Sequence, residues 1–253
     1  WMYRNKLKQN DSKTEVLVCG SKQRRELLPF RSIQVGDSKI PFSESVRTLG
    51  VMLDAELTME KHVSSVVSSC NYNIRRISRA RNCMSRDIAN TAAVTLVLSR
   101  LDYCNSLLHG ITKGQVKRFQ VAQNSAACLV TKTRKREHFE PVLRSLHWLP
   151  VKQRIQHKAL SVVYQTVDGS APEYLKEIVP AYNPTRVLRS SSQMLLSIPG
   201  KKEAKLKTYG ERAFSYAGPS LWRSIPVGLK RANSKAAFKS QLKTRLFREA
   251  DRE

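Results

Sequence analysis

Short apolar stretches are separated by polar and glycine-containing stretches in the first 54 positions of the chain. Segments 15–20, 32–37, 39–42 and 48–54 each hold two to four apolar residues, with Gly20, Gly36 and Gly50 as punctuation. Short apolar segments bounded by glycine are typical of short strands joined by turns. The pattern therefore predicts a short antiparallel β meander that ends near Asp54.

After Leu57 the apolar residues recur with the spacing of a helix. The steps between them are one, three or four residues, which places them along one side of a helix and leaves the nearby arginines off it. This stripe consists of Met59, Val63, Val66, Val67, Cys70, Ile74 and Ile77. Two more helices are predicted at about 86–109 and 113–131. Three helices with short connections predict a bundle over residues 57–131.

Residues 132–253 continue the helical pattern with less regularity. Helices are predicted at 151–167, at 172–179 and in the basic C-terminal stretch, where Ser234 is suited to cap the helix. Residues 183–208 are rich in Ser, Pro and Lys and predict a long irregular loop. The predicted fold class is α+β and mostly α, with parts at 1–56, 57–131 and 132–253.

The charge of the chain indicates a polyanionic partner. Lysine and arginine number 45 against 20 aspartate and glutamate residues, which gives a formal net charge of +25. Such an excess is the usual sign of a phosphate-bearing partner, so RNA, an RNA–DNA hybrid or DNA is expected. No apolar run suits a membrane span and no secretory signal is visible, which predicts an intracellular protein of the nucleus or cytoplasm with no membrane partner.

Nine sequence blocks carry a resemblance to a known family. They are NKLKQNDSKTEVLVCGS, VRTLGVMLD, SRLDYCNSLLHG, QNSAACLV, LHWLPVKQRI, APEYL, RVLRSS, YGERAFSYAGPSLW and FKSQLKTRLF. In this order and spacing they resemble the C-terminal part of the reverse transcriptase of non-LTR retrotransposons (LINEs) of the jockey and chicken-repeat type. The resemblance implies that residues 1–56 are the end of the palm with a primer-grip-like hairpin, that 57–131 are a thumb-like bundle, and that 132–253 are a basic C-terminal region.

The resemblance also implies that the catalytic Tyr-x-Asp-Asp turn and its Mg²⁺ ions belong to a part of the polymerase that precedes Trp1. No Asp-Asp pair occurs in the 253 residues, and Asp54 and Asp102 are single carboxylates for which a solvated or salt-bridged role is expected. The five cysteines match no metal site, and no nucleotide-binding or hydrolase motif is present. We therefore predict no catalytic residue, metal, cofactor or small-molecule substrate for this chain.

Candidate nucleic-acid contacts follow from the same resemblance. In the family, Lys13 would lie beside the incoming nucleotide and Gly50 beside the primer, although Asn10 and Asp11 could simply close a turn and Gly50 could be an ordinary hairpin glycine. The thumb position would bring a set of cations to duplex phosphates, unless these side chains are merely solvated. This set is Lys61, Arg75, Arg76, Arg79, Arg81, Lys113, Lys117 and Arg118.

Aromatic residues in the C-terminal region allow a second kind of contact. Trp148, Tyr209, Phe214, Tyr216 and Trp222 lie among basic residues and could stack on unpaired bases or form a core. Three interpretations of the whole chain remain open at this point. It is a truncated RNA-directed DNA polymerase that retains sequence-independent binding, a non-enzymatic nucleic-acid-binding protein derived from a retrotransposon, or a relic with no selected function.

Overall fold

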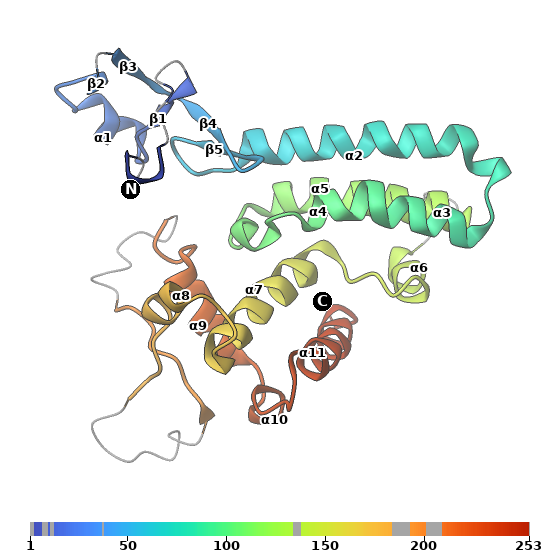
Figure 1. The fold of residues 1–253 in the computed structure, drawn as a ribbon. Coiled ribbons are helices and arrows are strands. Elements are labelled where there is room, and N and C mark those ends of the chain that lie inside the picture. Colours follow the sequence, from blue (N-terminus) through green and yellow to red (C-terminus); the bar gives the residue numbers. More distant parts are fainter. Residues whose placement is uncertain are drawn as a thin grey trace. The chain divides into compact units, whose positions relative to one another are not determined.

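Helices dominate the computed structural model, which describes residues 3–6, 10, 13–36, 38–133, 138–183, 193–200 and 209–252. Strands form a small part of these residues, so the predicted α+β, mostly α class is confirmed (Figure 1). The chain divides into two units, Trp1–Ser65 and Val66–Glu253. Within the described residues, every helix is too short or too polar to span a lipid bilayer.

Two small sheets form the first unit. Its elements are η1 (Tyr3–Asn5), β1 (Val16–Leu17), α1 (Lys22–Glu26), β2 (Ser32–Val35), β3 (Ser38–Ser43), β4 (Ser45–Thr48) and β5 (Val51–Asp54). The strand order of the first sheet is β1-β3-β2, with β2 antiparallel and β1 parallel to β3. The predicted meander is therefore corrected at β1. Helix α1 and β2 return the chain, so that β1 and β3 run in the same direction.

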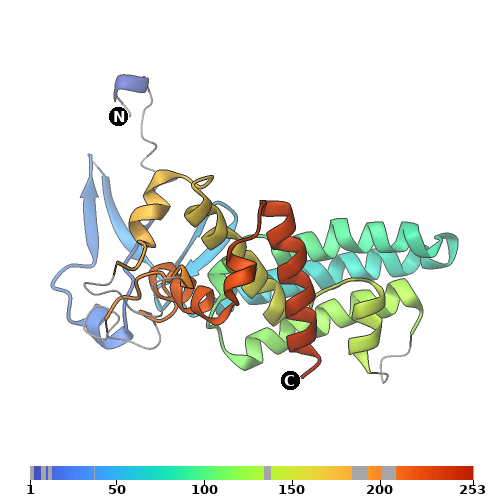
Figure 2. The ribbon, with the colours of Figure 1, turned by 90° about the horizontal axis from the view of Figure 1, so that it is seen from below.

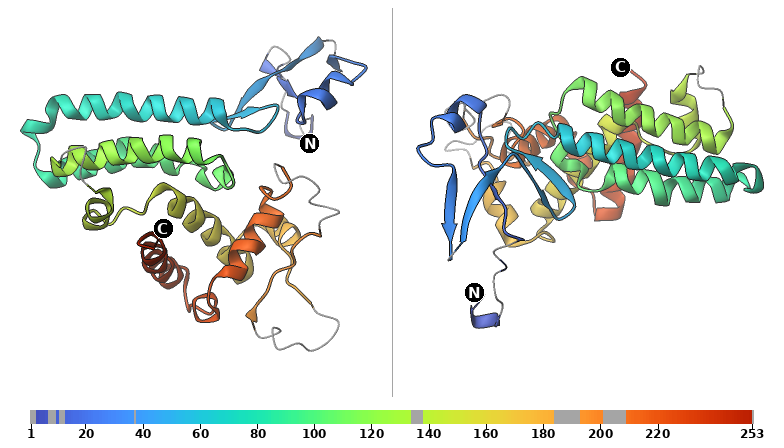
Figure 3. Two further views of the ribbon diagram at one scale, coloured as in Figure 1. Left: turned by 180° about the vertical axis from the view of Figure 1, so that it is seen from behind. Right: turned by 90° about the horizontal axis from the view of Figure 1, so that it is seen from above.

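The predicted bundle begins with α2 (Glu60–Ala80), whose apolar stripe faces inward. Cys70 is fully buried and Ile77 is nearly so, and Cys70 Sγ lies 3.7 Å from the carbonyl oxygen of Val97 on the second helix. The third helix is α5 (Lys113–Thr131), which starts with a capping box formed by Thr112 and Gln115. From Val66 onward, α2 runs beside the other two helices in Figures 1 and 3.

The second helix of the bundle is interrupted and shorter than predicted. It consists of α3 (Arg86–Ala93), the π-helical turn η4 (Val94–Leu98) and α4 (Ser99–Asp102). Cys104 adopts a left-handed backbone conformation with φ of 51°, which ends the helix, and the short η5 (Asn105–Leu108) follows. The predicted end at residue 109 is therefore too late, because the backbone turns at Cys104.

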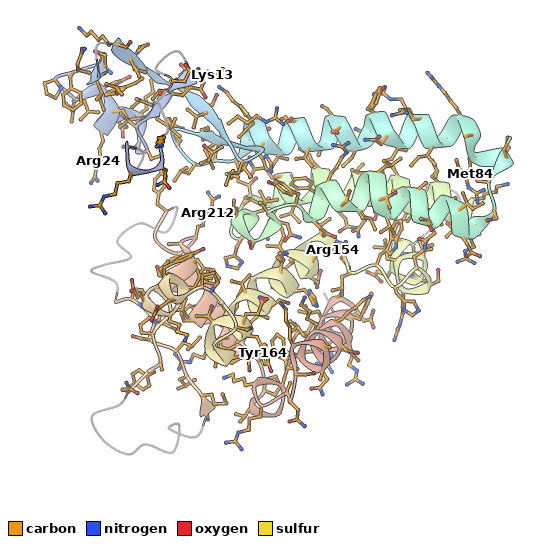
Figure 4. The ribbon with its side chains drawn as sticks, viewed as in Figure 1. Lys13, Arg24, Met84, Arg154, Tyr164 and Arg212 are labelled. Carbon is orange, nitrogen blue, oxygen red and sulfur yellow. The ribbon has the colours of Figure 1, made fainter. Side chains whose placement is uncertain are left out.

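The rest of the second unit is built around a hydrophobic core of its own. The helices are α6 (Phe139–Ser145), α7 (Val151–Asp168), α8 (Glu173–Ile178), α9 (Phe214–Ser224), α10 (Val227–Lys230) and α11 (Lys235–Ala250), and η3 (Arg81–Cys83) follows α2. Tyr164 of α7, labelled in Figure 4, stacks on Phe238 of α11, and Trp222 of α9 is fully buried beside them. Of the predicted loop 183–208, residues 184–192 and 201–208 lie outside the described part.

Hydrogen bonds attach this C-terminal region to the bundle. The buried amide of Gln123 on α5 donates to the carbonyl oxygen of Leu149 (2.8 Å), and the amide oxygen of Gln120 accepts from the backbone N–H of Val151 (2.8 Å). Helix α7 is thus fixed to α5 at its first residue. The division of the chain into three parts, with boundaries at 56/57 and 131/132, stays a prediction.

Candidate nucleic-acid interface

The predicted site residues of the first unit lie in turns. The backbone N–H of Lys13 donates to the carbonyl oxygen of Asn10 (3.1 Å), and Thr14 Oγ1 donates to the same oxygen (3.0 Å). The Lys13 side chain is exposed (Figure 4). A closed turn precedes β1, as the simpler interpretation of Asn10 predicted, while Asp11 and Ser12 lie outside the described residues.

Gly50 occupies the hairpin turn between β4 and β5. Its φ is 82°, and Leu49 before it also has a positive φ of 47°. Two successive positive φ angles are typical of the tight turn whose twist matches that of the flanking strands. Turn geometry alone therefore accounts for the glycine. The hairpin itself, predicted from VRTLGVMLD, is confirmed by the pairing of Thr48 with Val51.

Lys61 and Asp54 join this hairpin to the start of α2. Lys61 Nζ donates to Ser45 Oγ (2.9 Å), and the Asp54 carboxylate accepts from the backbone N–H groups of Thr58 (2.8 Å) and Met59 (2.7 Å). Asp54 therefore satisfies donors at the entrance of the helix. Lys61 belongs to the first unit, so it is not placed relative to the cations of the second unit.

A groove of about 800 Å³ lies between the C-terminal halves of α2 and α5. Among the described residues, three cations line it and no carboxylate does. The lining residues are Asn71, Ile74, Arg75, Ser78, Arg81, Asn82, Ser125, Cys128, Leu129, Lys132 and Thr133. Cations interspersed with neutral hydrogen-bonding groups suit contacts with phosphates and sugars that do not depend on base sequence.

Arg75, Arg76 and Arg79 form an exposed basic strip on α2. Arg75 lines the groove, and helical spacing places Arg79 and then Arg76 progressively further around the helix. The Arg76 guanidinium lies over the ring of Tyr72 at 5.7 Å, which holds it against the helix surface. This strip is the part of the predicted set that extends the groove into solvent.

Arg81 has a structural role that the sequence did not predict. Its Nε and Nη2 donate to the carbonyl oxygens of Leu129 (2.7 Å) and Val130 (2.8 Å), and Nη1 donates to that of Met84 (2.9 Å). The last carbonyls of a helix lack partners within it, so Arg81 completes the C-terminal turn of α5. We therefore remove Arg81 from the set of phosphate-contacting residues.

The cations of α5 lie away from the α2 strip. Lys113 and Lys117 are exposed and Arg118 is half-buried, in the first two turns of α5. A rise of about 1.5 Å per residue separates Lys113 and Lys117 from Leu129 by roughly 18–24 Å along the helix axis. Arg118 lies on the same side of α5 as Ser125 and Leu129, because the spacings of seven and four residues between them correspond to nearly whole helical turns. The α5 members of the predicted set therefore lie in the N-terminal part of this helix, whereas the groove lies at its C-terminal end.

Lys132 is the groove cation that sequence analysis missed. It follows the last residue of α5, where its φ of 59° ends the helix and its side chain is exposed. A lysine immediately after a predicted helix is a weak signal, since such residues commonly serve as helix caps. The sequence continues with the basic residues 134–136, which lie outside the described part.

The remaining candidates have structural partners. The guanidinium of Arg154 makes a two-pronged ion pair with the Asp102 carboxylate, so the predicted salt-bridged role of Asp102 is confirmed. Trp148 and Trp222 are buried and Phe214 packs on the core, which confirms the core interpretation for these three aromatics. Among the described residues, no three His, Cys, Asp or Glu side chains are grouped as metal ligands.

Comparisons with models of protein families, with curated proteins and with solved structures give no match for this chain.

Proposed function

We propose that this chain binds duplex nucleic acid without sequence preference and without catalysis. In this proposal it derives from the C-terminal part of a non-LTR retrotransposon reverse transcriptase, and α2 and α5 take the position of the polymerase thumb. The preferred partner is an RNA–DNA hybrid or duplex RNA, encountered in the nucleus or the cytoplasm. One observation carries the proposal, namely the basic groove along α2 and α5 with its row of exposed arginines.

The charge distribution supports this choice of partner. Arg75 on α2 and Lys132 just after α5 both line the groove, and Arg76 and Arg79 continue the positive surface along α2. Within the described part of the chain no carboxylate lines the groove, so none of these lining residues offsets the positive field. A duplex presents phosphates on both sides of a groove, which matches two facing helices that carry cations.

The two single carboxylates support the non-catalytic part of the proposal. Asp54 accepts two backbone N–H groups and Asp102 pairs with Arg154, so both are engaged in structural contacts. Two-metal nucleotidyl transfer uses carboxylates that hold ions about 4 Å apart. We therefore expect no template-directed nucleotide incorporation by this chain.

A charge-neutralising triple substitution tests the groove. We would measure the fluorescence anisotropy of a labelled RNA–DNA hybrid with the wild-type chain and with Arg75→Gln, Arg76→Gln and Arg79→Gln combined. If each arginine contacts one phosphate, the slope of log affinity against log salt should become shallower by roughly two to three. The matched control combines Lys22→Gln, Arg24→Gln and Lys39→Gln, which removes three exposed cations from the first unit.

Cys128 provides an independent readout because it lines the groove and its side chain is partly exposed. Bound hybrid should slow the alkylation of Cys128 but not that of the exposed Cys19 in the first unit. The proposal fails if the control triple flattens the salt slope as much as the arginine triple does. It fails equally if saturating hybrid leaves the alkylation of Cys128 unchanged.

A further inference from the structure

A second basic site lies between α7 and α11, away from the groove. A cavity of about 350 Å³ is bounded by these two helices, by the end of α4 and by the turn before α7. This volume falls within the range of about 300–1,000 Å³ that is usual for small-molecule sites. Figure 2 shows α11 lying across α7, and Figure 4 marks Arg154 on the side of α7 that faces α4.

The cavity gathers cations in two pairs. Arg154 and Lys158 are four residues apart on α7, and Lys239 and Lys243 are four residues apart on α11, so each pair lies on one helix face. His147 and His157 complete the set of basic groups that line it. Like charges at this spacing destabilise a helix, and here two such pairs face one volume.

Asp102 is the one carboxylate among the lining residues, and it is already engaged. It pairs with Arg154 and also accepts from the Asn105 side-chain amide at 3.2 Å. Among the described residues, no carboxylate lies within ion-pair distance of Lys158, Lys239 or Lys243. Three ammonium groups therefore face the cavity without a compensating negative charge.

Asn105 adds an independent polar feature to the wall. Its side chain is 3% exposed, and its Oδ1 is buried without a hydrogen-bond partner among the described residues. An unsatisfied buried acceptor is unfavourable and calls for a donor. An anion alone provides charge but no donor, whereas a sugar hydroxyl next to a phosphate provides both.

Burial disfavours the protonated form of two of the basic groups that line the cavity, Lys243 and His157. Desolvation and then the neighbouring Arg154 lower the pKa of Lys243. Desolvation is also the main cause that lowers the pKa of His157, although the hydrogen bond from its Nε2 to the Lys239 carbonyl oxygen (3.3 Å) acts in the opposite direction. A bound anion would stabilise the protonated form of both groups.

We propose that this cavity binds a phosphomonoester carried by a hydroxyl-bearing sugar. The phosphate would lie among Lys158, Lys239 and Lys243, and a rotation of the Asn105 side chain would bring its Oδ1 to a sugar hydroxyl that donates to it. Two sources share this chemistry, a free nucleotide and the phosphorylated end of an RNA strand. This site does not depend on the α2–α5 groove, so either proposal can fail alone.

Calorimetric titration of the whole chain with adenosine 5′-monophosphate tests the site. The wild type should bind this nucleotide and should not bind adenosine. The double variant Lys239→Gln with Lys243→Gln should bind at least tenfold more weakly, because two charge-assisted contacts are lost. The dideoxy form of the nucleotide should bind about fivefold more weakly than the nucleotide itself, because the donor to Asn105 is missing.

Controls separate a specific site from general charge. The double variant Lys235→Gln with Arg248→Gln removes two exposed cations from the same helix outside the cavity and should keep wild-type affinity. The arginine triple of the groove should also keep it. Removing Lys239 and Lys243 should not unfold the chain, because it relieves repulsion, and Lys158→Gln serves as a second variant of the same wall.

The outcomes decide both the site and the source. Equal losses in the cavity double and the α11 control double, or equal binding of adenosine and its monophosphate, would overturn the proposal. Equal binding of the dideoxy form would overturn the role of Asn105. An RNA oligonucleotide with a 5′-phosphate can be compared with its 5′-hydroxyl form as a competitor of the nucleotide. If the phosphorylated form competes better on the wild type but not on the cavity double variant, the site binds strand ends. Nucleotide binding without that preference assigns it to free nucleotides.

Discussion

The groove along α2 and α5 and the cavity between α7 and α11 are both basic, yet they hold their cations differently. In the groove, Arg75 and Lys132 are exposed, and Arg81 is committed to helix carbonyls. In the cavity, Lys239 and Lys243 of α11 and Lys158 of α7 line one half-open hollow, although Lys158 and Lys239 are themselves exposed. An open row of cations can follow a long polyanion, whereas converging cations select one compact anion. Net charge alone therefore does not say which kind of phosphate ligand a surface takes.

The dependence of binding affinity on salt concentration should be the largest difference between the groove and the cavity. If about six phosphates are neutralised, the affinity for an RNA–DNA hybrid should fall roughly a thousandfold between 50 and 200 mM salt. The affinity for adenosine 5′-monophosphate should fall less than about tenfold, because a compact anion releases few counterions. Anisotropy and calorimetry over the same salt series measure both. Parallel losses would mean that the two regions do not differ in kind.

Arg81 and Arg79 test whether neighbouring arginines have different roles. Arg81→Gln should lower the free energy of unfolding by about 2–4 kcal/mol, because three donors to backbone carbonyls are lost from a partly buried position. Arg79→Gln should leave the stability unchanged and should weaken hybrid binding. Urea unfolding and anisotropy on each variant provide the measurements. A stable Arg81→Gln chain with weakened hybrid binding would return Arg81 to the phosphate-contacting set.

The sequence predicts features that depend on local periodicity. The α2 stripe, the β4–β5 hairpin and the helix that Ser234 caps all follow from spacings of a few residues, and the structure confirms them. Ser234 accepts from the backbone N–H of Ala237 as expected. These elements could be predicted because the interactions that define them lie within one turn of chain.

The features that the sequence does not predict depend on tertiary packing. The parallel partner of β1, the Arg81 contacts with α5 and the cavity all join residues far apart in the chain. Periodicity places Lys239 and Lys243 on one face of α11, but it does not say that α7 presents Arg154 and Lys158 to that face. The sequence does not predict the left-handed turn at Cys104 either, since cysteine has no preference for that backbone conformation.

The loss of folding stability at acid pH should be the smallest of the differences between the cavity and the groove. His157 lines the cavity, whereas no histidine lines the groove. Burial lowers the pKa of His157 from its ordinary value of 6.5, and it also lowers the pKa of His62 and His109. Between the lowered and the ordinary value the unfolded chain binds more protons than the folded chain, so stability rises with pH. The chain should therefore lose stability as the pH falls below about 6.5.

The variant His157→Gln should reduce this acid sensitivity without abolishing it, because His62 and His109 contribute in the same direction. Glutamine can still donate to the Lys239 carbonyl oxygen, so the contact with α11 need not be lost. Arg79→Gln is the matched control, and any change in its stability should be the same at pH 7.5 and pH 5.5. Thermal unfolding at the two pH values gives the comparison. His157→Gln could instead lose as much stability at pH 5.5 as the wild type does. Protonation of His157 would then not oppose folding, and the repulsion inferred for the cavity would come from its lysines alone.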